Sequence, residues 1–196
     1  MRSKTVAGSV REALVAVQHQ VGVLVTSVDE QRGAIGHDDL STTLASVRSL
    51  QARLEFVALT LVGEVDRRGS HVHDGAISTA AWVRMHSRVA PREAAADVRA
   101  ARVLESGELP VTTEAFRAGE IDRAHLRVIA DGVADAPPGS GALIEPEALQ
   151  AARQSDPREV AGVMRMFRHA LDPDDADAAA VARYDRRGFS AAAMRT

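Results

Sequence analysis

Large aliphatic residues recur in the N-terminal part of the chain at alternating steps of four and three positions. This spacing places every member of the series on one face of an α-helix and is the spacing of a coiled-coil seam. Ser9 and Glu12 form a capping box, in which each side chain satisfies a free backbone N–H at a helix start. We therefore predict a long helix that begins near Ser9 and carries one aliphatic stripe: Val10, Leu14, Val17, Val21, Leu24 and Val28.

A second stripe follows the break at Gly33–Gly36. Either Asp38 or Asp39 can cap this second helix, which is about 40 Å long at a rise of about 1.5 Å per residue. Because the connection is short, we expect the two helices to form an antiparallel hairpin over residues 1–68. The second stripe comprises Leu40, Leu44, Val47, Leu50, Leu54, Val57, Leu61 and Val65.

Helices of this length usually bury such seams against more than one partner. The seams either close an ordinary bundle within the chain or form a contact between two copies. We expect a homodimer, and its predicted contact residues are Val10, Leu14, Val17, Val21, Leu24, Val28, Leu50, Leu54 and Leu61.

The composition agrees with a helical protein. Aromatic residues make up only 3% of the chain and hydrophobic residues 45%, which favours an all-α fold packed through small side chains over a sandwich or barrel. The chain contains neither Cys nor Asn. Without Cys there is no disulfide, thiolate nucleophile or Cys-ligated zinc, which fits a reducing compartment.

We expect a cytoplasmic protein that does not enter a membrane. Residues 1–5 lack the apolar run of a signal peptide. The longest stretch free of Asp, Glu, Lys and Arg is Ala13–Val28, which is too short and too polar to span a bilayer.

The middle part, residues 69–136, opens with a glycine-flanked loop and continues as four shorter helices. Ser78 caps a helix over residues 79–86, and Pro91 precedes one over residues 92–105. Thr112 or Thr113 is expected to cap a short helix that ends at Gly119, and Asp122 to cap a helix that ends near Ala134.

The third part, residues 137–196, starts with the linker-like stretch Pro137–Gly141 and then reads as further helices. Helix starts are predicted at Pro146, at Asp156–Pro157 and at Asp172–Pro173, the last of them leading into a helix over residues 174–187. No stop signal follows, so we expect the sequence to be a fragment of a longer protein.

Residues 78–105 have the outline of a helix-turn-helix, whose second helix can lie in a DNA major groove. Arg suits this role because its planar fork donates two parallel hydrogen bonds to phosphate or guanine. Residues 67–127 contain ten Arg and eight acidic residues, so this part is weakly positive. The predicted DNA-binding residues are Arg84, His86, Arg88, Arg92, Arg99 and Arg102.

Two alternatives oppose this interpretation. Coding bias would also produce the Arg excess, and the chain would then be an interaction module without DNA binding. Glu93 and Asp97 on the second helix would repel phosphate; they could instead accept hydrogen bonds from cytosine, but a solvated helix face fits them better.

Motifs for catalysis are weak in this sequence. His71, His73 and Asp74 are a possible metal cluster, which would indicate a metal-dependent hydrolase, but an exposed polar loop fits the flanking glycines better. His125 is expected to be a packed or capping residue rather than a base. Without a phosphate-binding loop, a nucleophile elbow or a zinc-protease motif, we predict no catalytic residue, no cofactor and no small-molecule substrate.

A series of short motifs resembles the actinobacterial family called domain of unknown function 222, whose members commonly precede an HNH endonuclease domain. The helix-turn-helix outline also resembles, more weakly, that of ParB-type partition proteins. The motifs are Glu64–Gly69, Asp74–Gly75, Ser78–Val83, Pro91–Ala94, Leu109–Pro110, Ala118–Ile121 and His125.

The sequence departs from the family pattern in the turn, where Arg88 and Ala90 replace a common Gly and Ser. If that position requires a left-handed backbone, the loss of Gly strains it. The HNH chemistry implied by the resemblance needs an Asn, which this sequence lacks, so a nuclease domain would lie beyond Thr196. We therefore expect a non-catalytic N-terminal region that forms a homodimer and binds double-stranded DNA.

Overall fold

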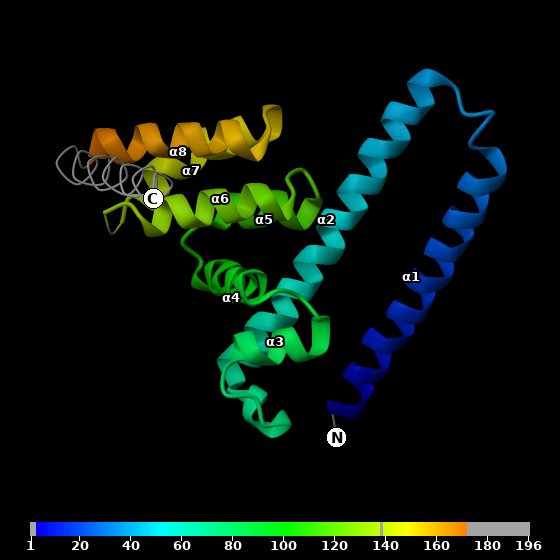
Figure 1. The fold of residues 1–196 in the computed structure, drawn as a ribbon, viewed down its shortest axis with the longest axis horizontal. Helices are drawn as coiled ribbons and strands as arrows, with labels where there is room; N and C mark the ends of the chain where they lie inside the picture. The colour runs from blue at the N-terminus through cyan, green and yellow to red at the C-terminus, as the bar shows by residue number, and fades with distance from the viewer. Residues whose placement is uncertain (1–2, 138, 172–196) are drawn as a thin grey trace, which may run out of the picture. The chain divides into compact units, whose positions relative to one another are not determined.

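The computed structural model describes residues 3–137 and 139–171, and every regular element in these ranges is a helix (Figure 1). This confirms the predicted all-α fold. The helix predicted over residues 174–187 and the start predicted at Asp172–Pro173 lie outside the described residues. The elements are α1 (Ser3–Gln31), α2 (His37–Arg68), the 3-10 helix η1 (Ser70–Asp74), α3 (Thr79–Ser87), α4 (Pro91–Ser106), α5 (Pro110–Ala118), α6 (Arg123–Ala134), α7 (Gly141–Gln154) and α8 (Pro157–Leu171).

The chain divides into two compact units, residues 1–46 and residues 47–196. In the first unit, a short turn joins α1 to the first turns of α2, and the Ala34 N–H donates to the Gln31 carbonyl at 2.8 Å. The predicted start of α1 was wrong, because the helix begins at Ser3 and the capping box at Ser9 and Glu12 lies inside it. No proline interrupts the residues ahead of Ser9, so the helix extends toward the N-terminus.

The core of the second unit lies where α5, α6, α7 and α8 meet one face of α2. Phe116 of α5 is fully buried, and its ring meets Phe56 of α2 edge-on with 5.8 Å between the ring centroids. Burying a Leu, Ile or Phe side chain is worth about 1.5–3 kcal/mol, so this cluster is the main source of stability in the unit. Its largest fully buried aliphatic residues are Leu109, Leu126, Ile129, Ile144, Leu149 and Val160.

A smaller apolar cluster joins α3 to α4. Val83 of α3 packs with Ala94 and Val98 of α4, and Val62 of α2 borders the group. The small Ala side chains along α4 let the neighbouring helices approach closely, and six of its sixteen residues are buried.

Three of the predicted helix starts are confirmed, and in each a local side chain forms the cap. The Ser78 hydroxyl accepts from the Ala81 N–H at 3.1 Å, and Asp122 accepts from the His125 N–H at 2.9 Å. Asp156 accepts from the Glu159 N–H at 3.0 Å. Each bond satisfies one of the backbone donors that a helix leaves free in its first turn.

The predicted start of α5 was wrong. The helix begins at Pro110, and Thr112 lies within it instead of capping it. The Leu109 side chain forms no cap, and the Thr112 N–H donates at 2.7 Å to the carboxylate of Glu145 in α7, which is only 4% exposed. A side chain from a distant part of the sequence thus replaces the local cap.

The predicted helix start at Pro146 was also wrong. Helix α7 begins at Gly141, so Pro146 lies inside it. A proline removes one backbone hydrogen bond from a helix interior. Burial of Ile144 before it and of Ala148 and Leu149 after it outweighs this loss, because all three pack in the core.

Candidate functional site

The connection between α3 and α4 consists of Arg88, Val89 and Ala90. Arg88 has a left-handed backbone with φ of 55°, and its N–H donates to the Arg84 carbonyl at 3.0 Å to end α3. This is the conformation that glycine adopts most easily, and another residue there costs about 1–2 kcal/mol. The turn therefore does require a left-handed position, and Arg88 occupies it under strain.

Three of the predicted DNA-binding residues surround this turn. Arg84, Arg88 and Arg92 are exposed, and their guanidinium groups have no hydrogen-bond or ion-pair partner among the described residues. The N-cap residue of α4, Ala90, makes no side-chain cap. The turn therefore presents three free cations next to the positive end of a helix.

His86, the fourth predicted residue, is engaged with the loop ahead of α3. Its Nε2 lies 3.1 Å from Oδ2 of Asp74, and its ring meets the Trp82 ring edge-on at a centroid distance of 4.2 Å. The Trp82 Nε1–H donates to the same Asp74 oxygen at 2.6 Å. One carboxylate thus connects η1 to two residues of α3.

Arg102, on the exposed edge of α4, pairs with Asp66 of α2. Its Nε and Nη2 donate to the two carboxylate oxygens at 2.7 and 3.1 Å. These bonds hold the pKa of Asp66 below its usual range, and a bond from the Thr79 hydroxyl at 2.6 Å acts in the same direction. Arg99 lies more loosely, 3.7 Å from Asp131 of α6.

Helix α4 contacts α2, α3 and α6, and its buried residues include Ala94, Asp97 and Ala101. The exposed cations Arg92, Arg99 and Arg102 occupy one edge of the helix. A helix packed on this many sides offers a ligand a narrow edge rather than the broad face of a helix lying deep in a groove.

Arg123 of α6 is a residue that the sequence did not single out. It donates to Glu93 at 2.6 Å and to Asp97 at 3.0 Å, and it thereby links α6 to α4. Burial raises the pKa of Asp97 above its usual value, and the Arg123 charge opposes the rise. The interpretation of Asp97 as part of a solvated helix face was therefore wrong, because only 6% of the residue is exposed.

A polar cleft of about 410 Å³ adjoins Arg123. Burial raises the pKa of Glu55 on its α2 wall, and the Arg123 charge lowers it in part. Both signs of charge line the cleft, so it has no clear preference for an anion or a cation. The other charged residues of its lining are Arg48, Asp122 and Arg127.

The predicted metal cluster is divided between two environments. His71 Nδ1 lies 3.4 Å from the Thr79 hydroxyl, whereas His73 is exposed. Within the ranges that the structure describes, no group of His, Cys, Asp and Glu is arranged to hold a metal ion.

His125 is a packed capping residue, as predicted. Its Nδ1 lies 2.8 Å from Asp122 and its Nε2 lies 2.9 Å from the Ser155 carbonyl.

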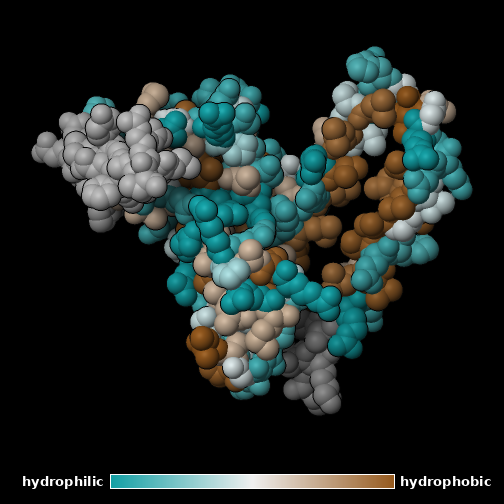
Figure 2. Space-filling model, viewed as in Figure 1, coloured by the Kyte–Doolittle hydropathy of each residue, from teal (hydrophilic) through white to brown (hydrophobic). Residues whose placement is uncertain are grey.

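The residues predicted for dimerisation are exposed. Figure 2 shows hydrophobic residues in a band along α1 and in another along α2. On α2, Leu50, Leu54 and Leu61 lie about half a turn from the buried residues Ala52 and Leu59, so the helix has two apolar faces. None of the helices in the described ranges is long and apolar enough to cross a membrane. The exposed stripe of α1 is Val10, Leu14, Val17, Val21, Leu24 and Val28.

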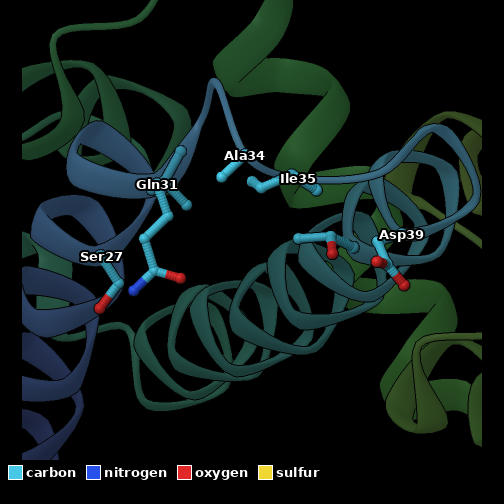
Figure 3. A pocket seen from close by; sticks show the side chains of 7 residues that line it. Ser27, Gln31, Ala34, Ile35 and Asp39 are labelled. Carbon is cyan, nitrogen blue, oxygen red and sulfur yellow. The ribbon is translucent and has the colours of Figure 1, made fainter.

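A hollow of about 360 Å³ lies at the turn between α1 and α2 in the first unit (Figure 3). Ser27 and Gln31 border it from α1, Ile35 from the turn and Asp39 from α2. A single carboxylate and an amide give it no catalytic or metal-binding chemistry. It shows instead that the two helices do not fill the space beside Val28, the last residue of the α1 stripe.

Several residues of the short motifs that resemble the family make contacts between separate elements. Arg153 of α7 donates at 2.7 Å to Glu120, which lies between α5 and α6. Within the motifs, Asp66, Asp74 and Glu93 accept from Arg102, Trp82 and Arg123, and Leu109 and Ile121 are buried. Residues of the motifs therefore join α2 to α4, η1 to α3, α4 to α6, and α7 to the connection between α5 and α6.

Comparisons with known proteins identify the family of the chain. No curated protein and no solved structure matches the chain. Residues 41–196, more than half of the sequence, match the family described as domain of unknown function (DUF222). The chain therefore belongs to the DUF222 family.

Proposed function

We propose that this chain is a non-catalytic region that binds duplex DNA at the α3–α4 turn and forms a homodimer. One observation carries the DNA-binding part, namely that Arg84, Arg88 and Arg92 are exposed around the turn without a partner among the described residues. Guanidinium groups free of carboxylates can contact phosphate oxygens without first breaking an ion pair.

The ion pairs of the other cations indicate which part of the DNA this surface would contact. Asp66 holds Arg102 and Asp131 lies near Arg99, so both would contribute only after exchanging a carboxylate for a phosphate. Glu93 does not oppose binding strongly, because Arg123 pairs with it. We therefore expect contacts mainly to the DNA backbone, with strong salt dependence and little base specificity.

The wider setting of the protein is also part of the proposal. A chain without Cys fits a cytoplasmic protein. The chain resembles proteins that carry an HNH nuclease, and its sequence has no Asn for that chemistry, so we propose that these residues do not carry out cleavage. This region would then deliver a nuclease to DNA rather than cut it.

A titration of fluorescent duplex DNA at several salt concentrations tests the proposal. The triple substitution Arg84→Ala, Arg88→Ala, Arg92→Ala should weaken binding and lower the slope of log affinity against log salt by about 3, or about 0.9 for each lost phosphate contact. A matched triple substitution of Arg48, Arg53 and Arg127 on α2 and α6 removes the same charge elsewhere. Absence of salt-dependent binding, or equal loss in both triples, would overturn the DNA-binding proposal.

The second candidate is an interaction module that does not bind DNA. The exposed aliphatic stripes of α1 and α2 favour it, because contiguous exposed apolar surface usually marks an interface with another protein. The same titration separates the two candidates. A stable dimer that binds no duplex even at low salt would leave the interaction module as the function.

A further inference from the structure

Helix α4 offers little surface to a ligand along its middle. From Glu93 to Ala101, Arg99 is the single exposed residue, because the other side chains pack on neighbouring elements. The helix also carries the carboxylates of Glu93, Asp97 and Glu105, which oppose the approach of phosphate. The middle of α4 therefore has neither the exposed surface nor the charge of a helix that lies in a DNA groove.

Helix α3 differs from α4 in charge. The stretch from Ala76 to Arg92 includes all of α3 and the turn that follows it, and it contains neither Asp nor Glu. Arg84, Arg88 and Arg92 are its cations. This stretch is therefore positive, which complements the negative charge of a DNA backbone.

Two of these cations share a face of α3 with an exposed methionine. Val83, which packs with α4, lies about half a turn from this face, so the face points away from the core. Met85 is 57% exposed. The face consists of four residues with the helical spacing i, i+3, i+4 and i+7: Ala81, Arg84, Met85 and Arg88.

Two carboxylates accept hydrogen bonds from α3. Asp66 accepts from the Thr79 hydroxyl, and Thr79 is buried on the opposite side of the helix. Asp74 accepts from the Trp82 N–H at 2.6 Å and lies 3.1 Å from the His86 ring, so it lies at the edge of the face next to the methionine. The two guanidinium groups of the face have no hydrogen-bond or ion-pair partner among the described residues.

We propose that α3, rather than α4, faces the major groove of the bound duplex, with Met85 against the base edges and Arg84 and Arg88 on phosphates. The inference rests on the proposed DNA binding and names the helix that contributes most to it. The nine residues of α3 span about 13 Å, close to the major-groove width of about 12 Å. Apolar side chains contact the thymine methyl group there. Because a methionine side chain is flexible, it adds affinity with little preference for one sequence.

The salt titration tests the role of Met85. Met85→Ala should weaken binding of the full chain to duplex DNA about tenfold, since it removes apolar surface from the contact. The slope of log affinity against log salt should not change, because no phosphate contact is lost. Met166→Ala is the matched control, since Met166 is a 71% exposed methionine on α8, and it should leave the affinity unchanged.

Thiol labelling tests which helix faces the DNA. The sequence has no Cys, so Met85→Cys, Arg99→Cys and Met166→Cys each carry a single thiol. Saturating duplex should slow the maleimide labelling of Met85→Cys several-fold. The labelling of Arg99→Cys on α4 should slow much less, and that of Met166→Cys on α8 should not change.

These measurements separate failure of the inference from failure of the proposed function. A wild-type chain that binds no duplex at low salt would overturn both. The inference alone is overturned if Met85→Ala binds as well as Met166→Ala while the triple arginine variant still loses salt-dependent binding. Protection of Arg99→Cys in place of Met85→Cys has the same meaning. Circular dichroism checks that every variant keeps its helices.

Discussion

Arg123 on α6 donates to Asp97 on α4 across 3.0 Å, and its second Nη donates to Glu93 one turn earlier on the same helix. Asp97 is almost fully buried, so this bond satisfies a carboxylate that water cannot reach well. One guanidinium group of α6 therefore binds two carboxylates of α4.

Removing that guanidinium should destabilise the fold. Arg123→Ala leaves Asp97 buried beside Glu93 without the cation that donates to it, and the free energy of unfolding should fall by about 3 kcal/mol. Urea denaturation measures the change. Arg99→Ala is the matched control, since Arg99 lies 3.7 Å from Asp131 with both side chains more than half exposed, and its loss should cost less than about 1 kcal/mol. Equal effects of the two substitutions would contradict the role of Arg123.

The stability of the fold should depend on the ionisation of Glu55. Burial raises its pKa above the ordinary value of 4.5, so the folded state binds this proton more tightly than the unfolded state. Stability should therefore fall as the pH rises from about 4.5 through the raised pKa, and Glu55→Gln should flatten that fall. Denaturant midpoints across this pH range measure the difference.

The ionisation of Asp66 should give a pH dependence of stability opposite to that of Glu55, so Asp66 serves as a control. Its pairing with Arg102 lowers its pKa below 3.8, so its contribution is complete above that pH and is lost on acidification through the lowered pKa. Asp66→Asn should therefore lower stability by a constant amount above that pH and remove part of the fall on acidification. For Glu55, the contradicting result is that the stability of Glu55→Gln follows pH in parallel with that of the wild type between about 4.5 and neutrality. Burial of Glu55 would then not have the expected effect.

The loop formed by η1 should loosen when Asp74 is removed. Asp74→Ala deletes the acceptor of both the Trp82 N–H and the His86 ring, and the cost should be about 1–2 kcal/mol. Trp82 is the only tryptophan, so quenching of its fluorescence by acrylamide reports the opening directly. His73→Ala, in the same loop, changes an exposed residue and should leave the quenching unchanged.

Gly119 and Gly107 should respond differently to alanine. Both have a left-handed backbone, with φ of 78° and 71°, so each substitution carries strain of about 1 kcal/mol. At Gly119 the new Cβ would also lie 2.6 Å from the carbonyl oxygen of Ser49 on α2, whereas at Gly107 it would meet open space. Gly119→Ala should therefore lower the thermal midpoint much more than Gly107→Ala, and similar midpoints would contradict the close approach.

Sequence patterns predicted the features that depend on neighbouring residues. The caps by Ser78, Asp122 and Asp156 were predictable because each capping side chain and the backbone N–H that donates to it lie within three positions. The starts of α5 and α7 were not, because the Glu145 cap of α5 comes from 33 positions away and core burial keeps α7 helical through Pro146. The spacing of residues along the sequence reveals neither a cap from a distant residue nor burial in the core.

In the candidate site too, the sequence predicted only what neighbouring residues determine. The outline of two helices and a turn indicated which Arg residues surround the break, and all six predicted residues are exposed. It could not separate the free Arg88 from the paired Arg102, whose partner Asp66 is 36 positions away. Arg123 was missed because its acceptors lie on another helix, and no local signal marks a residue of this kind.

The bond between Glu145 and the Thr112 N–H also bears on the order in which the protein is made. The whole of α5 is synthesised before Glu145, so the first turn of α5 has no side-chain cap until most of α7 has emerged. A short helix with an unsatisfied first turn frays readily in water. We therefore expect α5 to become stable late, during the docking of α7, and not as each residue leaves the tunnel.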